Sequence, residues 1–197
     1  MSAASNLRPE FMHHYYLFRR KVFKVFGGAF HVYDEMGNVV LYSKQLAFKL
    51  KEDFRIHSDE RQTTELLRIK TPHILDIAAR YDVQDSTTGE AVGAVRRTFL
   101  RSLVRDQWMF LSPDGQEIGK LKERSLLGAL LSRWINWVPQ HYVAETTYEA
   151  PVAEIDQHFN LFVLKYDMRI ADANPPIDRR LLIAAGILLA AIERRQD

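Results

Sequence analysis

Cysteine is absent from this chain of 197 residues. A disulfide framework, a thiolate metal site and a cysteine nucleophile are therefore excluded, and a reducing compartment fits the composition. An excess of one charge is also missing, because 27 Lys and Arg residues stand against 25 Asp and Glu residues, a formal net charge of +2. No global electric field therefore requires a nucleic-acid partner, and none is expected.

Long apolar runs are scarce as well. The first twenty residues, MSAASNLRPEFMHHYYLFRR, contain no continuous apolar stretch typical of a secretory signal, so we expect a cytoplasmic protein. The longest run is LLIAAGILLAAI, the twelve residues 181–192. A helix of that length rises about 18 Å, whereas the hydrocarbon core of a membrane is about 30 Å thick. Because charged residues stand at both ends of the run, we expect a helix buried in protein rather than a membrane span.

This C-terminal helix, expected over about residues 177–195, has no polar face. Its apolar positions cover the whole circumference, so protein must surround it. Small residues form two narrow strips that would let a surrounding wall approach closely: Gly186 with Ala190, and Ala184 with Ala191.

Capping residues mark the start of the helix. Asn174 or Asp178 can cap it, and Pro175 and Pro176 fit a first turn, where a missing N–H costs nothing. A second, shorter helix is expected over 126–138.

The rest of the chain has the alternating apolar and polar pattern of short strands. Hydrophobic residues make up 47% of the chain and charged residues 26%, which suits one sizeable core. We expect a tail over residues 1–16 and a single domain over 17–197. Three segments read as alternating strands joined by an Asp/Gly turn, and together with further strands they predict a mostly β sandwich or barrel. The hairpins are expected at 30–43, 81–97 and 108–123, and the further strands at 18–26, 54–58, 64–70, 142–148 and 159–170.

A repeat links two of these hairpins. The returning strand GEAVGAVR, which starts at Gly89, matches GQEIGKLK, which starts at Gly115. The spacing between units is irregular, which indicates a repeated hairpin and not a solenoid.

Three stretches carry a family resemblance: FRRKVFKVFGGAFHVYDEMGNVVLYSKQLAFKLKEDFRI, YDVQDSTTGEAVGAVRR and IDRRLLIAAGILLAAIERRQD. Over about residues 17–197 the chain resembles the LURP-one-related and phospholipid scramblase-like family, which has a tubby C-terminal-like fold, and in particular its bacterial branch. The resemblance implies a closed antiparallel barrel of about twelve strands around the buried C-terminal helix. It also points to lipids, because tubby proteins bind phosphoinositides and scramblases are described as calcium-dependent lipid movers.

The resemblance to scramblases does not extend to control by calcium. The segment that corresponds to the proposed calcium site of scramblases is 154–162, with Asp167 further on. Its acids are too few and too spread for the dense oxygen shell that calcium requires, so no tight calcium site is expected. The cysteine-rich palmitoylated segment and the proline-rich arm of scramblases are missing too.

Sequence patterns typical of catalytic and metal sites are absent. No serine stands in G-x-S-x-G, no P-loop or dinucleotide-binding G-x-G-x-x-G occurs, and no histidine pair has the spacing of a metal site on one helix. We expect a non-enzymatic protein with no catalytic residue, metal or cofactor. The residues considered are Ser102, Ser112, Ser132, His13, His14, His31, His57, His73, His141 and His158.

Basic and apolar residues gather in one stretch. Between residues 96 and 133, eight Lys and Arg residues stand against four acids, a local excess of +4. Cationic side chains beside Trp and Leu are typical of a membrane interface, which predicts peripheral binding of anionic phospholipid at the inner face of the membrane. A second basic cluster comprises Arg19, Arg20, Lys21 and Lys24. The expected lipid surface comprises Arg96, Arg97, Arg101, Arg105, Lys120, Lys122, Arg124, Arg133, Trp134 and Trp137.

Two other interpretations stay open. Trp134 and Trp137 would plug one end of the barrel if the arginines were only a solvated strand face, and the protein would then be a structural or protein-interaction scaffold. Phospholipid scrambling is the third, and it needs a membrane passage that a run of twelve residues does not provide. A lipocalin-type carrier is disfavoured because the helix would fill the lumen.

Overall fold

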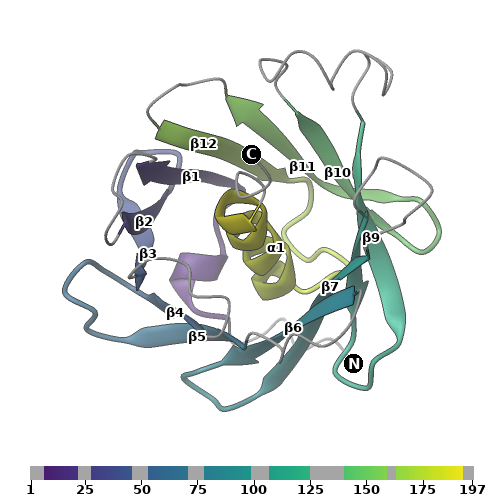
Figure 1. The fold of residues 1–197 in the computed structure, drawn as a ribbon, viewed down its shortest axis with the longest axis horizontal. Helices are drawn as coiled ribbons and strands as arrows, with labels where there is room; N and C mark the ends of the chain where they lie inside the picture. Colours follow the sequence, from purple (N-terminus) through teal and green to yellow (C-terminus); the bar gives the residue numbers. More distant parts are fainter. Residues whose placement is uncertain are drawn as a thin grey trace.

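A computed structural model describes residues 7–21, 28–45, 53–70, 78–98, 107–124, 140–158 and 163–192. Within these ranges, twelve strands form one closed antiparallel barrel around a C-terminal helix (Figure 1), which confirms the predicted fold class. Every strand pairs with its neighbours in sequence, and β1 pairs with β12 to close the barrel. The strands are β1 (Tyr15–Lys21), β2 (Gly28–Tyr33), β3 (Val39–Gln45), β4 (Phe54–His57), β5 (Glu65–Lys70), β6 (Ala78–Asp85), β7 (Ala91–Thr98), β8 (Gln107–Leu111), β9 (Glu117–Glu123), β10 (His141–Thr146), β11 (Pro151–His158) and β12 (Val163–Ile170).

The three predicted hairpins are present as β2–β3, β6–β7 and β8–β9. Their turns use acidic side chains and glycines as expected. The Asp34 carboxylate accepts the N–H groups of Met36 and Asn38, and Gly37 has a φ of 83°, which suits glycine. Asp85 accepts the N–H of Thr87 in the same way. These carboxylates therefore hold turns.

One strand is missing from the sequence-based prediction. The sequence indicates strands at 142–148 and 159–170, but β11 lies between β10 and β12 and pairs with both. Glu154, Asp156 and His158 point outward from β11, but of the alternating inward positions from Ala153 onward only Ala153 and Ile155 are apolar, so the alternating pattern is short. The helix expected over 126–138 lies outside the described residues.

The C-terminal helix α1 (Arg179–Ile192) is buried in the barrel, as its composition predicts. Its apolar side chains from Leu181 to Ala191 are at most 2% exposed. Asp178 is the cap, because its Oδ1 accepts the backbone N–H of Arg180 at 2.8 Å. Pro175 and Pro176 precede the helix and do not form its first turn, which corrects the sequence-based expectation. No helix in the described ranges is long and apolar enough to cross a membrane.

Glycines let the wall and the helix approach. A Cβ atom at Gly186 would lie 2.6 Å from Cζ of Phe18, so β1 packs directly on the helix backbone at this point. On the facing walls, the repeated hairpins place Gly93 and Gly119 at equivalent positions. Cβ atoms there would lie 3.1 Å from Leu181 and 2.6 Å from Ile177, respectively. The sequence repeat therefore makes room for the start of the helix.

The described part of the expected N-terminal tail packs on the barrel. Residues Pro9–Phe11 form a short 3-10 helix, and the Phe11 side chain is fully buried. The next strand starts at Tyr15. The packed domain therefore includes residues before 17.

Candidate functional site

The barrel has two ends that differ in their connections. At one end, named here the turn end, short turns join the strands and α1 begins; they are 34–38, 58–64, 86–90, 112–116 and 147–150, with the segment 171–178 before the helix. At the other, the far end, the strands finish next to residues outside the described ranges, at 21 and 28, 45 and 54, 70 and 78, 98 and 107, 123 and 141, and 158 and 163. Because α1 starts at the turn end, its last residues lie toward the far end, where Arg20 donates to the carbonyl oxygens of Ala190 and Ala191.

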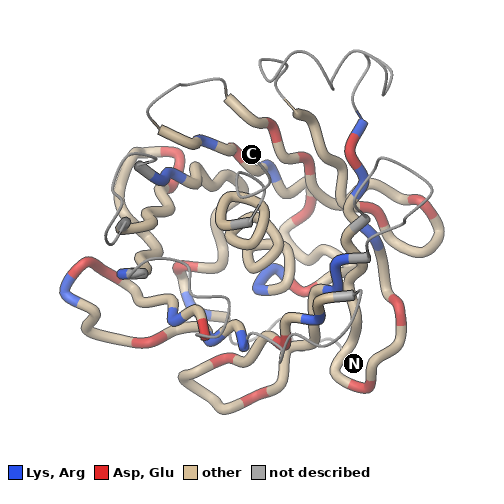
Figure 2. The backbone as a smooth tube through the Cα atoms, in the orientation of Figure 1, with Lys and Arg blue, Asp and Glu red and all other residues tan. Residues whose placement is uncertain are grey.

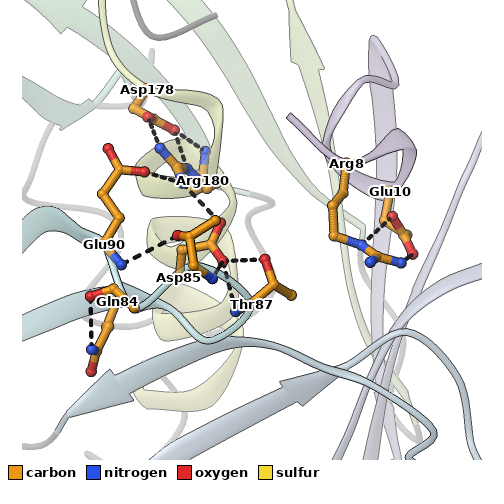
Figure 3. A network of polar contacts seen from close by, with 10 residues as sticks. Arg8, Glu10, Gln84, Asp85, Thr87, Glu90, Asp178 and Arg180 are labelled. Atoms are coloured by element: carbon orange, nitrogen blue, oxygen red, sulfur yellow. Dashed lines mark hydrogen bonds and ion pairs between the residues drawn. The ribbon is translucent and has the colours of Figure 1, made fainter. Parts of the chain in front are cut away.

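A buried ion network closes the turn end. Arg180 donates to Asp85 at 2.8 Å, to Glu90 at 2.9 Å and to Asp178 at 2.7 Å (Figure 3). Its side chain is only 4% exposed. Asp85 also holds the β6–β7 turn through Thr87, so one cation ties this turn to the start of α1.

The network shifts the ionisation of its members. Burial alone would lower the pKa of Arg180, but its hydrogen bonds to Asp178 and Glu90 outweigh burial and raise that pKa. Burial alone would raise the pKa of Asp85, but hydrogen bonds from Thr87 and Arg180 hold that pKa below its ordinary value. Both shifts favour the charged forms of Arg180 and Asp85, so this ion pair persists at neutral pH.

Arg179 anchors the N-terminal segment at the same end. Its guanidinium donates to the carbonyl oxygens of Phe11 at 2.7 Å, of Asp172 and Ala173 at 2.9 Å each, and of His13. The side chain is 1% exposed. Both arginines therefore serve packing, and the turn end offers no unsatisfied cation from α1.

The predicted lipid surface is divided by strand alternation. Arg96 points outward and pairs with Glu117. Arg97, the next residue, is only 3% exposed, and its guanidinium lies 5.3 Å from the ring centroid of buried Trp108. It therefore faces the interior and is not on the outer surface, which differs from the expectation for this residue.

The expected cations on β9 and directly after it are paired with acids. Lys120 lies 3.3 Å from Glu149, Lys122 lies 3.1 Å from Glu145, and Arg124 also pairs with Glu145. Burial alone would raise the pKa of Glu145, but hydrogen bonds from Lys122 and Arg124 hold that pKa below its ordinary value. This side of the barrel is a compensated ion network.

The other five residues of the predicted surface lie outside the described residues: Arg101, Arg105, Arg133, Trp134 and Trp137. Both interpretations of the two tryptophans, anchor and plug, therefore stay predictions. Their segment connects strands that end and begin at the far end, β9 and β10.

Comparison with known families decides the relationship. A family model described as LURP-one-related matches residues 39–190, most of the chain. The chain belongs to the LURP-one-related family. No curated protein and no solved structure matches it at a significant level.

On the LURP-one-related barrel, the segment compared with the scramblase calcium site is also an ion network. Asp156 and Asp167 face each other in register on β11 and β12, and Arg169 bridges them at 3.2 Å and 2.8 Å. His141 contacts Asp156 at 2.6 Å, and His158 contacts Asp167. Both carboxylates thus have cationic or imidazole partners, and the described residues contain no group of three or more His, Asp or Glu side chains that could hold a metal ion.

The sequence does not single out the neighbouring pair Arg19 and Lys165. They lie in register on β1 and β12 of this LURP-one-related barrel. Arg19 belongs to the second basic cluster of the sequence, but Arg20 of that cluster turns inward to the helix. The pairing of β1 with β12 joins the two ends of the barrel sequence, so no local pattern could have placed these two cations together.

Proposed function

We propose that this protein is a non-enzymatic module that binds the surface of anionic phospholipid membranes with its far end. One observation carries the proposal. The sequences attached to the strand ends at the far end are apolar and basic, whereas the turns at the other end are polar and acidic.

The contrast is visible in the sequences. The far-end segments contain Phe, Leu, Ile, Val or Trp in every case, and several contain Lys or Arg: VFKVFG at 22–27, LAFKLKE at 46–52, TPHILDI at 71–77, FLRSLVRD at 99–106, SLLGALLSRWINWVP at 125–139 and FNLF at 159–162. The turns are DEMGN at 34–38, SDERQTT at 58–64, STTGE at 86–90, SPDGQ at 112–116 and TYEA at 147–150. Figure 2 shows the acidic positions on several of these turns.

Physical chemistry links the far-end composition to lipid. Guanidinium and ammonium groups attract lipid phosphates, while Trp and Phe favour the headgroup level. The expected cations Arg101, Arg105 and Arg133, with Trp134 and Trp137, all belong to these sequences. Of the remaining predicted cations, the outward ones are already paired with acids and contribute less. In a cell, the anionic cytoplasmic leaflet would be the target.

Vesicle co-sedimentation tests the proposal. The protein should sediment with vesicles that contain phosphatidylserine and stay in solution with pure phosphatidylcholine, and high salt should release it because exposed charges are then screened. A double variant, Trp134→Ala with Trp137→Ala, separates the two interpretations of these residues. If the two tryptophans are membrane anchors, the double variant binds lipid more weakly at an unchanged melting temperature. If they plug the barrel, its melting temperature falls. If the wild type does not sediment with anionic vesicles even at low salt, the lipid proposal is wrong and the scaffold alternative replaces it.

A further inference from the structure

Directly opposed like charges on neighbouring strands destabilise a sheet unless they are compensated. In the described part of the barrel, four such register pairs occur. Three are compensated, because each member contacts a group of opposite charge or an imidazole: Arg55 with Arg68, Arg80 with Arg96, and Asp156 with Asp167. The fourth pair is Arg19 with Lys165.

Arg19 and Lys165 differ from the other three pairs, because neither has an acidic partner in the described ranges. Among the residues that the structure describes, no carboxylate oxygen lies within ion-pair distance of either side chain. Arg19 is exposed, and Lys165 is half-buried. Basic positions on the adjacent strands β1 and β12 can be followed in Figure 2.

The pair lies at the centre of a longer row. In register, His158 on β11 stands next to Lys165, Lys165 next to Arg19, and Arg19 next to His31 on β2. The two histidines already contact Asp167 and Glu60, so the two uncompensated charges are the central ones. Arg19 is two residues from the end of β1, and Lys165 is two residues from the start of β12. The row therefore lies toward the far end.

We propose that Arg19 and Lys165 together bind the phosphate group of an anionic lipid headgroup. Side chains directly opposite each other on antiparallel strands have Cβ atoms about 5 Å apart, so both cations can reach one phosphate. Arg supplies a planar fork that donates to two phosphate oxygens, and Lys adds a mobile point charge. The bound phosphate then supplies the negative charge that the described residues of the barrel do not. This inference rests on the proposed membrane function, and it names where on the barrel wall the headgroup binds.

Two variants of equal charge change test the site. Arg19→Gln with Lys165→Gln removes the uncompensated pair, whereas Lys120→Gln with Lys122→Gln removes two cations that are already paired with acids. Both are assayed on phosphatidylcholine vesicles that contain phosphatidic acid. The first variant should bind on the order of 10- to 30-fold more weakly than the wild type, and the second less than about 3-fold more weakly. Arg19→Lys should retain most of the affinity.

Folding and the source of phosphate are controlled separately. Because the first variant removes a repulsion, its melting temperature should equal or exceed that of the wild type. Inorganic phosphate at the ionic strength of a chloride control should not displace the protein from the vesicles; specific displacement would mean that the pair recognises free phosphate. If the wild type binds the vesicles and the first variant binds equally well, the Arg19–Lys165 site is wrong while the membrane function stands. If the wild type does not bind at all, the proposed function fails and this site fails with it.

Discussion

The two ends of the barrel differ in whether their charged residues are compensated by opposite charges. At the turn end, acids and arginines are matched to one another: Arg180 is surrounded by three carboxylates, and Arg179 by backbone carbonyl oxygens. Toward the far end, Arg19 and Lys165 stand opposite each other with no described acid to compensate them. Matched charges hold the fold together, whereas unmatched charges cost stability, and for this reason we propose a binding role for Arg19 and Lys165.

We expect the largest loss of stability when Arg180 is replaced. Arg180→Met should leave Asp85, Glu90 and Asp178 without their shared cation and lower the free energy of unfolding by about 3–5 kcal/mol. Arg20→Met removes the equivalent contact with α1 at the far end, and should cost only about 1–2 kcal/mol. Urea denaturation of both variants measures the difference. Equal losses would mean that the two ends contribute equally to folding.

Midway between the ends, the close packing of the helix on the wall should give the next largest loss of stability. Gly186→Leu forces a side chain against Phe18 and Met168, because a Cβ atom at this position would lie within 3.0 Å of both, and it should cost about 1–3 kcal/mol. The control is Ala91→Leu at an exposed strand position, with little expected change in the urea midpoint. A fully stable, soluble Gly186→Leu protein would contradict the close contact of helix and wall.

The adjacent arginines of β7 should differ in their contribution to stability, because Arg97 faces the interior and Arg96 faces outward. Arg97→Ala should cost about 2 kcal/mol, because it removes a desolvated cation from the Trp108 ring. Arg96→Ala breaks only an exposed pair with Glu117 and should cost less than about 1 kcal/mol. Thermal melts compare the two, and similar melting temperatures would argue against the inward orientation of Arg97.

Acid should weaken the contribution of Asp85 at the turn end. The pKa of Asp85 in the folded protein lies below its ordinary value of 3.8, so its contribution to stability is complete above about pH 4 and is lost as the pH falls through the folded value. Asp85→Asn should therefore be less stable than the wild type at about pH 6, with a gap that narrows below about pH 4. Melting temperatures across this range test the sign; a gap that widens in acid would refute it.

The sequence predicts the parts of the molecule whose signal is local. The all-apolar run at 181–192 predicts a buried helix, and Asp/Gly turns predict three hairpins that the structure contains. The strand β11 is missed because its alternating inward positions from Ala153 onward hold only two apolar residues, Ala153 and Ile155, and the third inward residue is the polar Gln157.

The site depends on signals that are not local. Arg96 and Arg97 look alike in sequence, yet alternation sends one outward and the other against Trp108. The acids that neutralise Lys120 and Lys122 come from the next hairpin, and Lys165 meets Arg19 only because the first and last strands pair. Register across the barrel decides which cations are compensated, and a single sequence does not contain it.

The orientation of the barrel on a membrane is the sharpest test of membrane binding through the far end. The chain has no cysteine, so one introduced cysteine gives one position for an environment-sensitive fluorophore. Asn136→Cys places it in the 125–139 sequence attached to the far end, and Tyr148→Cys places it on a turn whose native side chain is 93% exposed. On addition of vesicles that contain phosphatidylserine, we expect a blue shift of emission for the label at 136 and none for the label at 148. A shift at 148 alone, or at neither position, would contradict membrane binding through the far end.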